Sequence, residues 1–114
     1  MRLLVAVSMI LAGCTMQSTY KDVQDQTPKI SFQTTKTADQ YLGCISPKAV
    51  EIWPTANVLK DGNSWVISVL ENQFMTAINI TPNANGASVA LREWTGATVR
   101  SRFQRMRDAV EICR

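Results

Sequence analysis

What this chain can fold into is limited first by the apolar run near its N-terminus. The run occupies residues 3–12, follows a single cation, Arg2, and stops just before a cysteine, Cys14. A helix that crosses a membrane needs about 20 apolar residues, so this run is too short to span one. A positive start, a short apolar stretch and a small-residue exit are typical of a secretory signal peptide. We therefore expect residues 1–13 to be absent from the mature chain.

The exit of this run resembles the lipobox of bacterial lipoproteins, in which a cysteine is acylated and the chain is cut just before it. The matching positions are Leu11, Ala12, Gly13 and Cys14. A thiolate is the nucleophile that takes up the lipid, which explains the cysteine. The resemblance implies a diacylglycerol and an N-acyl chain on Cys14, and stable anchoring needs more than one chain. The alternatives are an ordinary secretory signal with a chance cysteine, or a short N-terminal core helix.

The residue after the cysteine indicates in which membrane such a lipoprotein is anchored. In many Gram-negative bacteria, lipoproteins with Asp at this position stay in the inner membrane, and here the residue is Thr15. The resemblance therefore implies a protein anchored in the outer membrane that faces the periplasm, with exposure at the cell surface left open.

Length and charge limit the mature protein further. Removing residues 1–13 from the 114 leaves 101, which is enough for one domain. Since Arg2 leaves with the leader, 11 cations and 9 anions remain, and a net charge of +2 is too mild to indicate a nucleic-acid partner. We expect a cleaved signal peptide (1–13), a lipidated N-terminus with a flexible polar tether (14–34) and a single domain (35–114).

Two further cysteines, Cys44 and Cys113, are 69 positions apart. With Cys14 assigned to lipid and an oxidising compartment, a disulfide between them is the expected state. In the chain-entropy account, closing a loop of this size stabilises a fold by about 4 kcal/mol. The alternative is two free buried thiols, as in a cytosolic protein. A zinc site is not expected, because the sequence has no His to complete the ligand shell.

The first helix signal lies around Cys44. Thr37 with Gln40 three residues later is a capping-box pattern. It predicts a short helix over residues 38–45, which Pro47 ends.

The C-terminal segment 98–113 is the clearest helix. Its apolar positions recur at spacings of four, three, four and three, which is one stripe at helical period. The stripe consists of Val99, Phe103, Met106, Val110 and Cys113. Thr98 is suited to cap its start. The stripe directs Cys113 toward the core, in agreement with its pairing with Cys44.

Between these helices, β-prone segments alternate with turn-forming residues. Strands are predicted at residues 50–53, 57–60, 65–70, 74–81 and 87–94. The alternation in the last strand separates one face, with Ala87, Val89 and Leu91, from the other, with Ser88, Ala90 and Arg92. In the strand before it, the residues predicted to share one face are Phe74, Thr76, Ile78 and Ile80.

Short turns between consecutive strands favour an antiparallel meander. We expect an α+β domain with a short helix, a meander of three to four strands and a C-terminal helix packed on one sheet face, the two helices being linked by the disulfide. The fragment 30–32 also alternates and is a candidate edge strand.

The residues that most enzymes use are missing. The sequence has no His, no G-x-S-x-G turn and no glycine-rich phosphate loop, and its carboxylates are scattered. We therefore expect a non-catalytic protein without a metal, and without a cofactor other than the lipid on Cys14. No small-molecule substrate is evident, and the expected partners are the membrane and another envelope protein.

Charge is uneven in the last helix. Residues 100–114 contain five Arg and two acidic residues. The candidate partner surface consists of Arg100, Arg102, Arg105 and Arg107. The planar fork of Arg suits phosphate and carboxylate groups. The alternative is that the Arg stems cover the edges of a packed helix, with Arg107 paired to Glu111 at helical spacing.

Three Trp residues, Trp53, Trp65 and Trp94, are many for a domain of this size. Trp is frequent at binding hot spots, but it also fills cores where one edge reaches water. We interpret all three as core or core-edge residues.

Taken together, the lipobox, the tether, the strand meander and the placement of the cysteines resemble small lipoproteins of Gram-negative bacteria and their prophages. Beyond the lipobox, this resemblance carries over no site residues. We expect an anchored envelope lipoprotein that binds another envelope protein. The alternatives are a phage- or plasmid-encoded lipoprotein that modulates exclusion or lysis, and a binder of anionic ligands or lipid headgroups through the Arg-flanked helix.

Overall fold

The structure is a computed structural model that describes residues 19–71, 73–94 and 100–114, the side chain of Arg100 excepted. These residues form three helices and one five-stranded antiparallel sheet, which confirms the α+β class. In chain order the elements are α1 (Tyr20–Gln24), β1 (Ile30–Thr34), α2 (Ala38–Ile52), β2 (Ala56–Asp61), β3 (Ser64–Glu71), β4 (Gln73–Asn83), β5 (Gly86–Glu93) and α3 (Arg100–Ile112).

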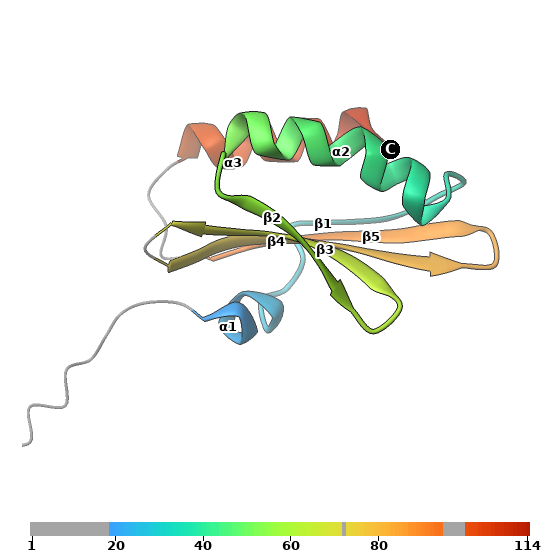
Figure 1. Ribbon diagram of the computed structural model, residues 1–114, viewed down its shortest axis with the longest axis horizontal. Helices are drawn as coiled ribbons and strands as arrows, with labels where there is room; N and C mark the ends of the chain where they lie inside the picture. The colour runs from blue at the N-terminus through green and yellow to red at the C-terminus, as the bar shows by residue number, and fades with distance from the viewer. Residues whose placement is uncertain (1–18, 72, 95–99) are drawn as a thin grey trace, which may run out of the picture.

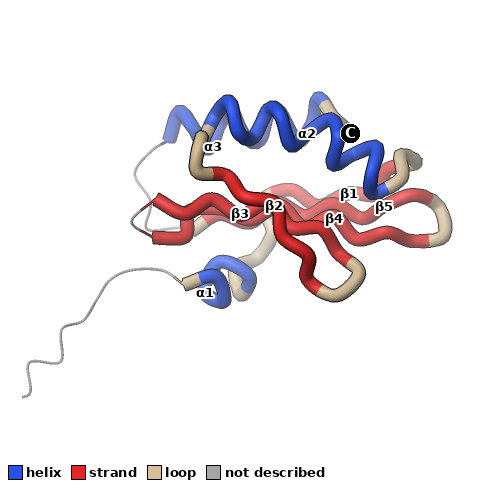
Figure 2. The backbone as a smooth tube through the Cα atoms, in the orientation of Figure 1, coloured by secondary structure: helices blue, strands red, loops and turns tan. Residues whose placement is uncertain are grey.

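The sheet has the strand order β1-β5-β4-β3-β2. Strands β2 to β5 form the predicted meander, and β1 adds to its far edge beside β5, from Ile30 opposite Leu91 to Thr34 opposite Ala87. Helices α2 and α3 cover one face of the sheet, and α1 lies against the opposite face (Figure 1). The tube view in Figure 2 shows the same three layers.

The main core lies between the sheet and the α2–α3 layer. On β5, Ala87, Val89 and Leu91 are buried, which confirms the predicted alternation. The hydroxyl of Tyr41 on α2 donates a buried hydrogen bond of 2.8 Å to the carbonyl of Val110 on α3. Burial raises the pKa of Tyr41, so this phenol stays protonated and keeps its hydrogen bond across the pH range in which proteins fold.

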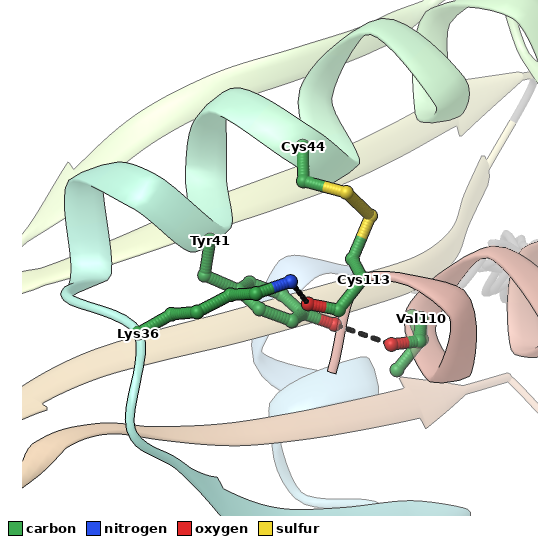
Figure 3. Close-up of a disulfide and its surroundings, with 5 residues drawn as sticks. All are labelled: Lys36, Tyr41, Cys44, Val110 and Cys113. Carbon is green, nitrogen blue, oxygen red and sulfur yellow. Dashed lines mark hydrogen bonds between the residues drawn. A yellow bond between two sulfur atoms is a disulfide. The ribbon is translucent and has the colours of Figure 1, made fainter.

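The two helices are also joined covalently. Cys44 on α2 and Cys113 just after α3 form the predicted disulfide, with their Cα atoms 5.7 Å apart. Beside it, the Nζ of Lys36 donates a hydrogen bond to the carbonyl of Cys113 (Figure 3). The bridge therefore holds the middle of α2 against the end of α3.

The predicted first helix is too short. Helix α2 begins at the expected Thr37–Gln40 capping box but continues through Pro47 to Ile52, so residues 50–53 are not a strand. A proline inside a helix costs about 3 kcal/mol. Here the buried stripe that contains Ile45 continues after the proline with Ala49 and Ile52. Burial of this stripe on the sheet offsets the cost.

The folded domain begins earlier than the predicted boundary at residue 35. Residues 20–34, assigned above to the tether, form α1 and β1, which brings the sheet to five strands rather than three or four. The cause is a second capping box, Thr19 with Asp22, followed by Val23, which is buried against the sheet. The predicted edge strand at residues 30–32 is confirmed as part of β1. The rest of the tether, residues 14–18, lies outside the described residues.

In strand β4, one residue, Phe74, faces the opposite side of the sheet from the one predicted. The register shifts between β3 and β4, with Val69 opposite Thr76 but Leu70 opposite Phe74. The extra residue in β4 turns Phe74 to the α1 side, where its ring packs edge-on against Tyr20 at 5.8 Å. Helix α3 is described from Arg100, and its predicted cap at Thr98 lies outside the described residues.

Candidate functional site

An amphipathic groove of about 210 Å³ lies between α2 and α3. It is lined by Lys48, Glu51, Ile52, Arg105, Asp108, Ala109 and Ile112. The groove is smaller than a typical small-molecule pocket, which has about 300–1,000 Å³. It therefore suits a side chain or helix face of a protein better than an enclosed ligand.

The groove follows from the way the two helices face each other. On α2, Cys44, Lys48 and Ile52 recur at a spacing of four, which places them along one side of the helix. On α3, Arg105 and Ala109 recur at the same spacing before Cys113. The disulfide joins the two stripes at one end, and the groove lies farther along them, so the helices run antiparallel.

The groove region combines exposed apolar groups with charges of both signs. Ile112 is 70% exposed, and Val50 on the outer side of α2 is 46% exposed. The charged side chains of the groove are Lys48, Glu51, Arg105 and Asp108. Within the described part of the chain, no ion pair joins these four groups to one another. An apolar centre with a charged rim is the usual composition of a protein–protein contact.

The arginines of the predicted partner surface have different surroundings in the structure. Arg105 lines the groove and is exposed. Arg102 instead donates to both carboxylate oxygens of Glu71 at 3.3 Å, with its guanidinium 6.0 Å from the ring centre of Trp53. The side chain of Arg100 lies outside the described residues. The four arginines therefore do not form one continuous surface.

Arg107 binds a buried carboxylate of the sheet and is not free to bind a partner. It donates to Glu93 on β5 through Nε, at 2.8 and 3.2 Å, and through Nη2, and Glu93 is only 4% exposed. This hydrogen bonding raises the pKa of Arg107. The predicted pair of Arg107 with Glu111 is wrong, since Glu111 accepts instead from Arg114 at 3.4 Å. The partner Glu93 comes from a different element, so helical spacing could not reveal it.

The Trp residues lie in the core or at its edge, as predicted. Trp53, at the end of α2, is fully buried and packs edge-on against Phe103 with ring centres 5.2 Å apart. Trp65 is half-buried, and its indole N–H donates to Asp39 at 3.3 Å. Trp94 is half-buried beside the small cluster under α1.

A second, larger cavity of about 410 Å³ lies on the α1 face of the sheet. Its lining is mostly polar and consists of Gln24, Ser31, Asp61, Asn79, Thr81, Ser88, Val89, Ala90 and Arg92. Small side chains make the hollow, because Ser31 stands opposite Ala90 and Ser88 opposite Thr81 in the sheet register. No local sequence motif indicates this site, although the alternation on β5 separates its polar positions, Ser88 and Arg92, from the core.

The described residues contain no group of three or more potential metal ligands of the His, Cys, Asp or Glu type. Over the same residues, no helix is both long enough and apolar enough to cross a membrane. The lipobox residues, Leu11 to Cys14, lie outside the described part of the chain.

Comparison with known protein families, with curated proteins and with solved structures finds no match to this chain. Its function is therefore inferred from its own residues.

Proposed function

We propose that this protein is a lipid-anchored, non-catalytic envelope lipoprotein that binds another envelope protein through the groove between α2 and α3. The observation that carries the binding site is the exposure of Ile112, 70%, at a groove with charges of both signs. The anchor is Cys14, in the outer membrane and facing the periplasm, and it rests on the lipobox resemblance.

The partner best suited to the groove is an amphipathic helix. Ile112 is the exposed apolar side chain of the groove, the buried Ile52 and Ala109 line it, and a groove between two antiparallel helices accepts the apolar face of a third helix. Each helix places one cation and one anion at the groove, Lys48 and Glu51 on α2 and Arg105 and Asp108 on α3. A partner helix with both acidic and basic residues would complement them. Burying apolar area contributes about 25 cal/mol per Å², so Ile112 would contribute most near the centre of the contact.

The position of the groove agrees with this role. Helix α1, the described element nearest the proposed anchor, lies on the opposite side of the sheet from α2 and α3 (Figure 1). With α1 toward the membrane, the groove points away from the bilayer, where a periplasmic partner is accessible. The alternative of a headgroup site on α3 receives less support, since Arg102 and Arg107 are paired with Glu71 and Glu93.

Photo-crosslinking in cells tests the groove. A photoreactive residue in place of Ile112 should give a discrete protein adduct, and one in place of Ala84, an exposed residue in the turn between β4 and β5 and outside the groove lining, should not. Ile112→Arg should abolish the corresponding pull-down, and Ala84→Arg should leave it intact. Equal adducts at both positions, or none at Ile112, would refute the groove as the contact.

The anchor has its own test. The intact mass of the protein purified from membranes should lack residues 1–13 and include the acyl chains. A mass with the leader retained, or without acyl chains, would remove the anchor and leave the groove to be judged by crosslinking alone.

A further inference from the structure

The folded domain starts close to the proposed anchor. The first described residue is Thr19, which caps α1, so only five residues lead from Cys14 to the fold. Five residues span at most about 18 Å when fully extended, and about 12 Å on average as a flexible coil. The 20-residue tether expected from sequence would have reached about 25 Å on average. Anchoring through Cys14, as proposed, would therefore hold the α1 side of the domain near the membrane surface.

The polar cavity is on this same side. Gln24, in the last turn of α1, lines it, and five helical residues separate Gln24 from Thr19 by about 7.5 Å. The sheet floor beneath it presents hydroxyl groups of Ser31, Thr81 and Ser88. The cavity therefore lies on the side of the sheet from which the proposed anchor would extend, and its lining comes from α1 and from strands β1, β2, β4 and β5.

Arg92 is the cation of the cavity. Its Nε donates to the carbonyl of Gln26 at 3.0 Å, and its Nη1 donates to the side-chain oxygen of Asn79 at 3.2 Å. A guanidinium has five N–H donors, so these two bonds orient the group without exhausting it. Among the described residues, no carboxylate lies within ion-pair distance of Arg92, in contrast to Arg102 and Arg107.

The neighbouring groups also favour an oxyanion beside Arg92. Because Oδ1 of Asn79 accepts from Arg92, its NH₂ group is left as a donor, and the hydroxyls of Ser31 and Ser88 are further donors. Charge-assisted bonds from Arg to phosphate are about twice as strong as neutral ones.

One carboxylate, Asp61, lines the same cavity and accepts a hydrogen bond from the hydroxyl of Tyr20 at 3.3 Å. It stands on β2, three strand spacings from β5, and the register aligns it with Ser88, four residues from Arg92. The Cα atoms of Asp61 and Arg92 are therefore about 20 Å apart. The repulsion of a phosphate at that separation is about 0.2 kcal/mol in water. It therefore does not oppose an anion at Arg92 appreciably, and it is available to polar hydrogens of a bound ligand.

We infer that the polar cavity on the α1 face binds the phosphate-bearing headgroup of a membrane phospholipid, with the phosphate at Arg92 and Asn79. The inference rests on the proposed anchoring through Cys14. The domain then has two opposed surfaces, one toward the headgroups and one toward a protein partner.

The experiment uses the full lipidated protein in vesicles of phosphatidylethanolamine and phosphatidylglycerol. A photoreactive residue replaces Gln33, whose side chain donates a hydrogen bond to Ser88 beside the cavity, or Ile112 on the opposite layer. We expect lipid adducts by mass spectrometry from position 33 and few from position 112. Equal yields from both, or none from position 33, would overturn the inference.

Matched substitutions test the chemistry. Arg92→Gln should reduce the adduct at position 33 about fivefold, as expected for loss of a charge-assisted bond. Arg105→Gln, with the same charge change on the helix layer, should leave it unchanged. Ser31→Phe should reduce it by filling the cavity while leaving Arg92 in place, and thermal unfolding of each variant shows whether the fold is retained. Adducts insensitive to both Arg92→Gln and Ser31→Phe would refute the site.

Millimolar glycerol 1-phosphate separates the two sources of phosphate. Persistence of the adduct supports a headgroup held at high local concentration. Complete displacement would mean that a soluble phosphate ester is the ligand and would overturn the assignment to lipid. The intact mass of the same sample shows whether Cys14 is acylated, so failure of the anchor and failure of the cavity are distinguished.

Discussion

The two faces of the sheet differ in how they are covered. On the α2–α3 side, twenty of the described residues form one buried core, closed by a disulfide between the helices. On the α1 side, three buried residues, Val23, Val66 and Ala77, form the small cluster under a five-residue helix. A helix this short is not stable alone, so its order depends on those few contacts. Stability is therefore concentrated on one face, and the other keeps its polar groups available for binding.

The largest change in stability is expected from removal of the disulfide on the α2–α3 side. Cys44→Ala with Cys113→Ala should lower the free energy of unfolding by about 4 kcal/mol, because the unfolded chain loses a long closed loop. Urea unfolding without reductant measures the change. The wild-type protein, unfolded with reductant present, should lose a similar amount. A loss below about 1 kcal/mol would show that the main core does not depend on the bridge.

The next test compares two ion pairs of α3 with the sheet. Glu93→Gln should cost about 3 kcal/mol, because Glu93 is 4% exposed and Arg107 would be left without its partner. The matched control Glu71→Gln should cost less than about 1 kcal/mol, because the side chain of Glu71 is 33% exposed and that of Glu93 only 5%. Chemical denaturation at neutral pH measures both. Equal costs would contradict the greater weight assigned to the buried carboxylate of Glu93.

The elements that sequence predicts correctly are those whose pattern is local. The alternation along β5 and the apolar stripe of α3 from Phe103 to Cys113 each follow from burial of a single face, and the first predicted member of that stripe, Val99, lies outside the described residues. The pairing of Cys44 with Cys113 follows from their number and expected compartment. The end of α2 was missed, because the cost of Pro47 is local whereas the burial of Ile52 that offsets it is tertiary.

The candidate sites were less predictable for the same reason. Sequence identified α3 as a partner surface, but only the fold shows that Arg107 meets Glu93 whereas Arg105 meets a groove shared with Lys48. The cavity is less predictable still, because its lining comes from α1 and four strands. The Thr19–Asp22 capping box was the available signal that the fold extends toward Cys14.

A smaller effect is expected from the cluster under α1. Val23→Ala should cost about 2 kcal/mol, mostly by releasing α1 locally rather than by unfolding the main core. Hydrogen exchange should show faster exchange of the Asp25 amide, which bonds to the carbonyl of Lys21, with the amides of β4 little changed. Val110→Ala, in the main core, is the contrasting variant and should also accelerate the hydrogen exchange of the β4 amides. If Val23→Ala accelerated exchange in β4 by the same factor, the two faces would form one cooperative unit.

The smallest expected effect is a difference in pH dependence between the capping boxes of α1 and α2, which differ in the side chain that accepts from the N-cap backbone. In the α1 box, Asp22 accepts from the backbone N–H of Thr19 at 2.7 Å, whereas in the α2 box the uncharged Gln40 accepts from Thr37 at 2.9 Å. This hydrogen bond lowers the pKa of Asp22 below 3.8, so its stabilisation of α1 is present above that pH and is lost as the pH falls through the lowered pKa. The exchange protection of α1 should therefore decrease between pH 5 and about pH 2, and Asp22→Asn should reduce this dependence. Protection at the start of α2 should change less over the same range, because Gln40 does not titrate. An equal loss of exchange protection at both helices would indicate that the whole domain unfolds in acid. It would contradict the conclusion that α1 is held on the sheet more weakly than α2 and opens independently.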